Sequence, residues 1–200
     1  DAIAHTWTDP YRWARGSELL SSGRKFNMTD MIEFQHDYLS IPARSLVPFF
    51  KDLPADDRQV EAARQMLLNW DFKLDKDSVQ AGIYVAFERQ LLDNIASLKV
   101  PEVASNFLNV GMKTTIDMLL APDGDFGNDP IAGRDEFVLD TLKQAVATLS
   151  EKFGRNMENW VYGQAEYKHA LIRHPLGAAV SDQIRSRLEV GPAPRGGNGF

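Results

Sequence analysis

The sequence predicts a mainly α protein: an irregular helical domain with short strands only toward its C-terminal end. Three observations carry this prediction. Apolar residues recur at helical spacing along residues 77–98, further segments with that spacing fill most of residues 11–153, and extended patterns are confined to the part after Asn159. We therefore expect a helical domain over residues 1–158 and an extended segment over residues 159–200.

The stretch from Asp77 to Leu98 is expected to form the central helix. Asp77 is the expected N-cap, because its carboxylate can accept hydrogen bonds from the N–H groups of the first turn, and Pro101 should end the helix. The apolar side chains share one broad face, which is typical of a packed centre rather than a surface seam. That face comprises Val79, Ile83, Phe87, Leu91 and Ile95, widened by Val85, Leu92 and Leu98.

Other helices are expected on both sides of this one. They should cover residues 11–22, 28 to about 39, a run ending at 49–50, 54–70, 112–120 and 135–153. Gly23 should end the first helix, Asn27 should cap the second, and Pro42 should break it. The pieces Trp160–Gly163 and the stretch around Leu171 have the pattern of short extended segments.

Composition excludes several classes of protein. The chain has 200 residues, 44% of them hydrophobic, which is enough to build a sizeable core. Its net charge is −6 and its Lys and Arg are scattered, which argues against a nucleic-acid partner or an anionic membrane surface. It has no apolar run of about 18 residues that would span a membrane. With no Cys, disulfide and thiolate chemistry are excluded.

The loop at residues 121–133 places acidic side chains at alternate positions, as a calcium site would. The spacing of an EF-hand does not hold, because its fifth position would be Gly127 and its twelfth, normally Glu, would be Arg134. A solvated turn is the better interpretation. The histidines form no close ligand pair, so packing or surface roles are expected for all of them. They are His5, His36, His169 and His174.

Several short motifs occur together in a characteristic order. They are DPYR (9–12), FNMTDM (26–31), QHD (35–37), LNWD (68–71), WVYGQAEYKHALIRHPLG (160–177) and GPAPRGGNGF (191–200). In this order they resemble the penicillin acylase (penicillin amidase) family of N-terminal-nucleophile hydrolases. The resemblance covers nearly the whole chain and fits a part of that family's larger catalytic β chain.

The resemblance implies an amidase in which a serine, freed at the N-terminus by self-cleavage, is the nucleophile and its own α-amine is the base. An asparagine and backbone N–H groups would hold the oxyanion. This chain begins at Asp1, so nucleophile and asparagine are expected upstream, and the chain alone is expected to be inactive. Its partners would be the α chain, the rest of the β chain and a small acyl-amide substrate, such as a penicillin or an acyl-homoserine lactone.

The resemblance also assigns roles to individual residues. Arg12 would help to order the catalytic asparagine and the substrate, and Asp1 lies where a calcium ligand is expected. His174 and Asn198 would have structural roles. Calcium is compatible with the full-length protein, but no cofactor is expected in this segment. Residues 159–200 would lead back to the hydrolase β core, and the protein would be periplasmic or secreted.

Position on the helix also singles out Arg12. A cation in the first turn of a helix is disfavoured by the helix dipole, so Arg12 is poorly explained by helix stability, although a solvated arginine remains the alternative. A different class of function is also open, a free-standing helical interaction module. The upstream sequence would separate the two, because only the amidase needs a cleavage junction followed by an Asn-rich segment.

Overall fold

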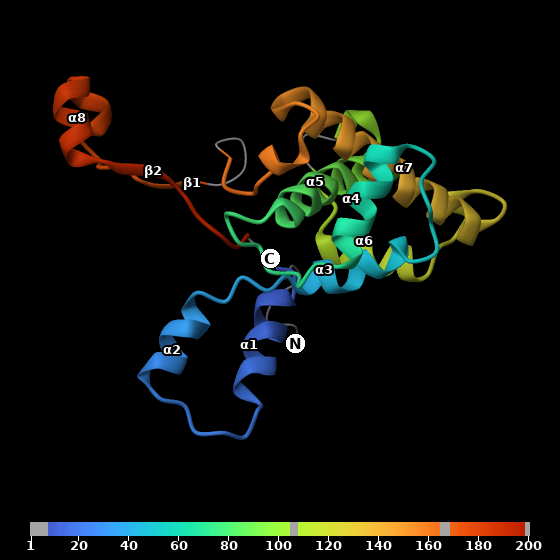
Figure 1. Ribbon diagram of the computed structural model, residues 1–200, viewed down its shortest axis with the longest axis horizontal. Coiled ribbons are helices and arrows are strands. Elements are labelled where there is room, and N and C mark those ends of the chain that lie inside the picture. The colour runs from blue at the N-terminus through green and yellow to red at the C-terminus, as the bar shows by residue number, and fades with distance from the viewer. Residues whose placement is uncertain (1–7, 105–107, 165–168, 199–200) are drawn as a thin grey trace.

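The computed structural model describes residues 8–104, 108–164 and 169–198. In this part the chain is mainly helical, with a single two-stranded antiparallel sheet, as the sequence predicts (Figure 1). The α-helices are α1 (Tyr11–Leu20), α2 (Met28–Gln35), α3 (Ile41–Leu46), α4 (Arg58–Leu68), α5 (Val79–Lys99), α6 (Met112–Leu120), α7 (Pro130–Phe153) and α8 (Asp182–Leu188). The 3-10 helices are η1 (Val47–Phe50), η2 (Glu102–Ala104), η3 (Gly124–Phe126), η4 (Met157–Asn159) and η5 (Gly177–Ala179), and the strands are β1 (His169–Ile172) and β2 (Val190–Pro194).

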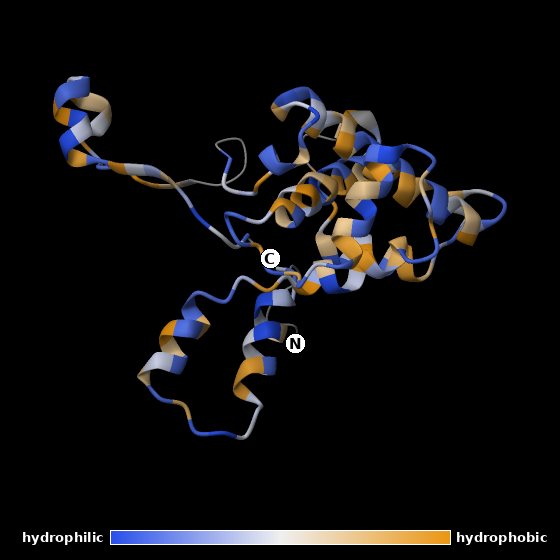
Figure 2. Ribbon diagram, viewed as in Figure 1, coloured by the Kyte–Doolittle hydropathy of each residue, from blue (hydrophilic) through white to orange (hydrophobic). Residues whose placement is uncertain are grey.

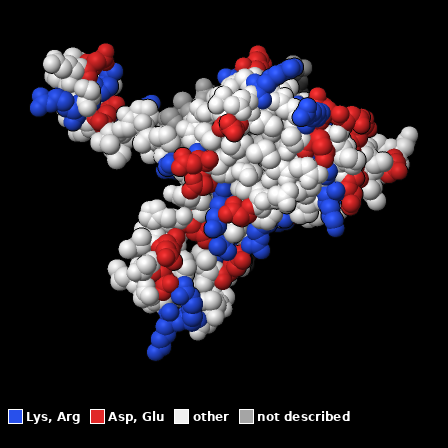
Figure 3. All heavy atoms as spheres, viewed as in Figure 1, with Lys and Arg blue, Asp and Glu red and all other residues white. Residues whose placement is uncertain are grey.

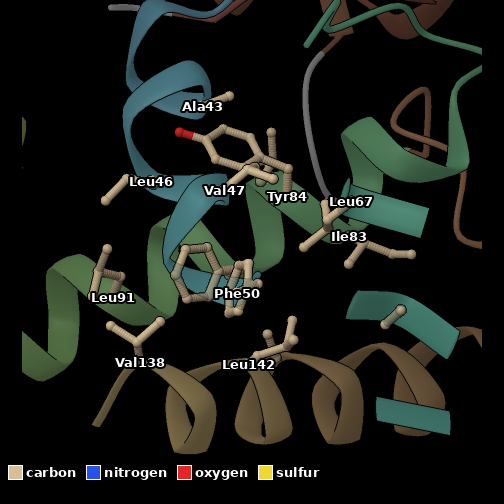
Figure 4. Packing of buried hydrophobic residues seen from close by; sticks show 14 of the residues in the cluster. Ala43, Leu46, Val47, Phe50, Leu67, Ile83, Tyr84, Leu91, Val138 and Leu142 are labelled. Atoms are coloured by element: carbon tan, nitrogen blue, oxygen red, sulfur yellow. The ribbon is translucent and has the colours of Figure 1, made fainter. Parts of the chain in front are cut away.

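Helix α5 is the centre of the helical body, as its broad apolar face predicts. It packs most extensively against α7 and also contacts α4 and α6. Phe87 is fully buried and meets Phe50 of η1 edge to face, with ring centroids 5.0 Å apart. Figure 4 shows Leu91 of α5 beside Val138 of α7 in the same cluster. Side chains of η1 and α7 thus pack against the same face of α5. This face is the centre of the hydrophobic core.

The start of α5 differs by one residue from the prediction. Ser78, not Asp77, is the N-cap, and its Oγ accepts a hydrogen bond from the backbone N–H of Ala81 at 3.1 Å. Asp77 instead pairs with Lys76 at the surface. At the other end the helix stops at Lys99, before Pro101 as expected, and Leu98 is 40% exposed rather than part of the buried face.

Several other predicted boundaries are wrong for local reasons; helix α4, for example, begins at Arg58 rather than at residue 54, because Asp57 is its cap. Helix α2 is capped by Asn27 as predicted but ends at Gln35. Pro42 begins α3 rather than breaking a helix, since Ser40 caps that helix and a first-turn proline gives up an N–H that has no helical partner. Helix α7 begins at Pro130, earlier than predicted, because Asp129 provides the cap and proline again fits the first turn.

The C-terminal region is partly as predicted. The stretch around Leu171 forms β1, which pairs with β2 in a ribbon that carries α8 away from the helical body (Figure 1). The prediction of an extended piece at Trp160–Gly163 is wrong, since no strand forms there: Trp160 and Val161 are irregular, and Tyr162 and Gly163 lie in a turn. Its alternating aromatic residues bury their rings in the core, and Tyr162 N–H donates to the carbonyl of Ser78 at 3.0 Å. The alternation therefore reflects packing rather than strand pairing.

Helices α1 and α2 also stand apart from the helical body (Figure 1). Figure 2 shows hydrophobic residues on both of them, and Trp13 is 75% and Met28 77% exposed. Among the described residues, no helix combines the length and apolar character needed to cross a membrane. On the face drawn in Figure 3, Lys and Arg are interspersed with Asp and Glu rather than gathered in one basic patch.

Candidate functional site

A cavity of about 660 Å³ lies where α1 and α2 meet the C-terminal strip, which we define as residues 195–198. Its volume falls in the range of ordinary small-molecule pockets. Apolar walls come from both helices, for example from Leu19, Met31 and Phe34. Arg12, the residue assigned to substrate positioning by resemblance, also lines this cavity. The cavity thus joins two chain segments that are far apart in the sequence.

Three arginines line this cavity, and they differ in their partners. Arg15 donates from Nε to Oδ2 of Asp37 at 2.8 Å and also forms an ion pair with Glu18 at 3.1 Å. Burial lowers the pKa of Arg15, but the hydrogen bonds to these two carboxylates outweigh it, so the pKa is raised overall. Arg12 and Arg195 are exposed and have no ion-pair partner among residues 8–104, 108–164 and 169–198. Arg15 therefore joins α1 to the segment that follows α2, whereas the other two remain open to a ligand.

The C-terminal strip lies tightly against the body. Gly197 N–H donates to the carbonyl of Leu74 at 2.8 Å, and the hydroxyl of Tyr162 donates to the carbonyl of Gly197 at 2.7 Å. A Cβ added to Gly196 would lie 2.6 Å from ring carbons of Tyr38. Glycine is required here because the backbone itself contacts the ring. This contact explains Gly196, whereas Gly197 has a φ of 75°, a backbone conformation that favours glycine.

Beneath the strip lies a buried acid, Glu88 of α5. Its side chain is only 4% exposed, and its Oε1 accepts a hydrogen bond from Nδ2 of Asn198 at 3.3 Å. Burial raises the pKa of Glu88 to about 7, and the nearby Tyr84 hydroxyl, the Asn198 amide and the charge of Arg89 oppose this shift only in part. Glu88 is therefore a buried group that titrates near neutral pH.

A second buried polar group lies one helical turn before Glu88. The hydroxyl of Tyr84 and Oε2 of Glu88 are both buried, and neither has a partner at full hydrogen-bond geometry among the described residues, although the hydroxyl lies near enough to the carboxylate to favour its ionised form. Burial is also the main cause that raises the pKa of Tyr84 well above its usual value. Buried polar atoms without partners are costly and uncommon in proteins, so this pair marks a place where packing alone does not explain the residues.

Sequence reasoning did not identify Glu88, although a signal was present. Glu88 lies four residues after Tyr84 and three before Leu91, so it shares the buried face of the central helix. An acidic residue on such a face is rarely left buried without a function or a partner. Its partner, Asn198, is 110 residues away in the sequence. No local pattern could have joined the two.

The other candidate residues are distributed over the molecule. Asp1 and His5 lie outside the described residues, as does the side chain of His169. His36 lies at the end of α2, where its Nδ1 is 2.9 Å from the carbonyl oxygen of Ile32. His174 accepts a hydrogen bond at Nδ1 from Leu176 N–H at 3.1 Å, within the HPLG turn. Neither of these two histidines lines the cavity.

The loop with the calcium-like pattern uses its carboxylates locally. Asp123 caps η3 by accepting from the N–H of Asp125 at 3.1 Å, and Asp125 forms an ion pair with Lys99 of α5. In the part of the chain that the structure describes, no three His, Asp or Glu side chains gather closely enough to hold a metal ion. Asp123 therefore shapes the loop, and Asp125 helps to attach it to α5.

Comparison with known proteins gives one clear match. A family model described as penicillin amidase matches residues 1–200. No curated protein matches the chain. The matched range includes α1, α2 and the C-terminal strip, so every element that forms the cavity lies within it.

Proposed function

This chain belongs to the penicillin amidase family, and from that premise we propose that it forms part of an N-terminal-serine amidohydrolase that acts on acylated amines. The proposed substrates are amides such as the side-chain amide of a penicillin or an acyl-homoserine lactone. One observation carries the proposal for this chain: Arg12 lines a cavity of about 660 Å³ whose walls are partly apolar. Such a cavity suits an acyl group, and the arginine suits a polar atom at the reacting end.

The nucleophile would come from the remainder of the same precursor. In this mechanism the serine hydroxyl attacks the amide carbonyl, its own α-amine takes the proton, and an asparagine helps to hold the oxyanion. The α chain and the rest of the β chain would supply these groups. The helical chain would wall and support the site, and alone it would have no amidase activity.

Arg12 would act by positioning. A guanidinium offers five N–H donors in a rigid fork, so it can hold an amide oxygen and a substrate oxygen at the same time. Arg12 is exposed in the first turn of α1, where the helix dipole disfavours a cation. Arg15, one turn later, already has carboxylate partners in Asp37 and Glu18. This contrast supports Arg12 as the residue that contacts the substrate.

Two parts of the chain that stand apart from the helical body, α1 with α2 and the β1–β2 ribbon with α8, would pack against the rest of the precursor. Exposed apolar residues occur on α1 and α2 and on the ribbon with α8, and exposed apolar surface of this kind marks interaction sites. Residues 159–200 would then lead from the helical domain over residues 1–158 back to the β core. A periplasmic or secreted location, and calcium bound at or near Asp1 in the full-length protein, are proposed from the family resemblance alone.

The test compares two arginines in the self-processed full-length protein. Arg12→Lys should lower kcat/KM by about 10²-fold, because a misplaced positioning group commonly costs that much, and should leave the unfolding midpoint unchanged. Arg58→Lys is the matched control, since Arg58 is also exposed in the first turn of a helix but does not line the cavity. Near-normal turnover by Arg12→Lys would overturn the proposed role of Arg12.

A second measurement tests whether the nucleophile lies outside this chain. The isolated chain should not hydrolyse phenylacetyl, phenoxyacetyl or long-chain acyl amides. Turnover by the isolated chain that is lost on changing one of its own residues would contradict an upstream nucleophile.

A further inference from the structure

We propose that Glu88 is a positioning residue for the cavity: through Asn198 it holds the C-terminal strip in place against the helical body. This inference rests on the proposed function, because it assigns a task to a residue that supports the same site. Glu88 itself does not line the cavity, whereas Asn198 does. The role of Glu88 is therefore indirect, and it acts on a wall rather than on the substrate.

The C-terminal strip is attached at two neighbouring residues. Its backbone is held at Gly197 by Leu74 on one side and Tyr162 on the other. Its next side chain, Asn198, reaches Glu88 with Nδ2 3.3 Å from Oε1. The two backbone hydrogen bonds fix the path of the chain at Gly197, but they leave the direction of the Asn198 side chain open. The hydrogen bond to Glu88 holds that side chain toward α5.

The position of Glu88 in the core holds its carboxylate in a fixed place. It lies on α5, the most central helix, between Tyr84 and Leu91, which are both fully buried. A side chain packed in this way has few rotamers available, so its carboxylate is fixed relative to the core. Burying a carboxylate without a full set of partners is unfavourable for folding. Its presence is better explained by a task at the strip than by stability.

The surroundings of Glu88 determine how its contact with Asn198 responds to pH. Within the described part of the chain, the charged or titratable groups near it are Arg89 and Tyr84 on its own helix and Tyr162 on the turn after η4, and Asn198 is its neutral partner. Burial brings the pKa of Glu88 to about 7. An ionised carboxylate is a stronger acceptor for the Asn198 amide than a neutral carboxyl group. The strip should therefore be held more firmly above neutral pH than below it.

Two substitutions separate positioning from general packing. Glu88→Gln keeps the shape and an acceptor oxygen but cannot ionise, so it should retain most activity and lose the pH response of the contact with Asn198. Glu88→Leu removes the acceptor and should lower kcat/KM by about 10-fold or more, the equivalent of one charge-assisted hydrogen bond. Asp93→Asn is the matched control, because Asp93 is exposed on the same helix.

The pH profile must be compared between variants, since the α-amine of the proposed nucleophile titrates in a similar range. The ratio of kcat/KM in wild type to that in Glu88→Gln should rise through about pH 7. In Asp93→Asn the same comparison with wild type should be flat. A flat ratio for Glu88→Gln would refute the role of ionisation at Glu88.

Hydrogen exchange gives a readout that does not depend on activity. In the full-length protein, the protection factor of the Gly197 amide should fall about 10-fold in Glu88→Leu and stay at the wild-type value in Asp93→Asn. Unchanged protection of Gly197 in a folded Glu88→Leu protein would overturn the proposal. If Glu88→Leu does not fold, Asn198→Ala breaks the same link from the strip and should also lower the protection of the Gly197 amide, and normal protection there would overturn the proposal. An inactive wild-type protein would refute the proposed function, while the exchange result would still decide the role of Glu88.

Discussion

Gly82 of α5 lies directly against the carbonyl oxygen of Trp160: a Cβ added to Gly82 would be 1.8 Å from that oxygen. Both residues are buried, and Trp160 fixes its own turn by donating from Nε1 to the carbonyl of Gly154 at 2.9 Å. Glycine normally weakens the interior of a helix. Here it permits the close approach of the turn that leads toward the C-terminal strip, and this approach brings Tyr162 to Gly197.

Gly82→Ala should therefore be destabilising, although alanine is the better helix former. The added methyl group collides with backbone that cannot move independently, and overpacking of this kind costs about 1–3 kcal/mol or more. Gly16→Ala is the control, because no atom lies within 4 Å of the Cβ position at Gly16 of α1. That change should be neutral or stabilise the protein by about 0.4–1 kcal/mol. The urea midpoints of the full-length variants give both values, and equal midpoints would contradict the close contact.

Phe87→Ala should strongly destabilise the helical body. The ring is fully buried and contacts Phe50, so its removal leaves a cavity in the centre and should cost about 3–5 kcal/mol. Leu98→Ala on the same helix should cost less than about 1 kcal/mol, because Leu98 is 40% exposed. Denaturant unfolding of the two variants measures the difference. A loss below about 1 kcal/mol for Phe87→Ala would place its ring outside the core.

Stability should also depend on pH through Glu88. The pKa of Glu88 is raised from 4.5 to about 7 in the folded protein, so folding favours the protonated form. Protonated Glu88 makes its full contribution to the free energy of unfolding below pH 4.5. This contribution is lost as the pH rises to about 7. A pKa shift of this size corresponds to a change of about 3 kcal/mol in the free energy of unfolding. Ionisation thus strengthens one local hydrogen bond while it lowers the stability of the whole fold.

Glu88→Gln tests this dependence directly. The variant should be less sensitive to pH between 5 and 7 than wild type, because it removes a group whose ionisation in this range is penalised by burial. Thermal unfolding of both proteins across that range measures the effect, with Asp93→Asn as the control for a change of charge on α5. Parallel curves for wild type and Glu88→Gln would show that Glu88 does not titrate there.

The helices were largely predictable because the signals that define them are local. Apolar spacing identified the buried face around Phe87. Asn27 was recognised as a cap because an N-cap side chain accepts a hydrogen bond from a backbone N–H in the first turn of its own helix, here that of Asp30. Errors of one or a few residues arose at helix ends, for example at Asp77, where the adjacent Ser78 is the cap. The family and the place of Arg12 came from the order of motifs along the chain.

By itself the sequence determined the mainly α class, the central helix and its buried face, since each depends on residues within about four positions of one another. Only the tertiary structure decided that Arg12 lines a cavity closed by residues 195–198, that Glu88 contacts Asn198, and that Gly82 must be glycine. Each of these contacts is between segments separated by many residues. The burial and the close approach that matter arise only after the segments meet. Burial raises the pKa of Glu88, and the Trp160 carbonyl excludes a Cβ at Gly82, because of neighbours that the folded chain alone brings there.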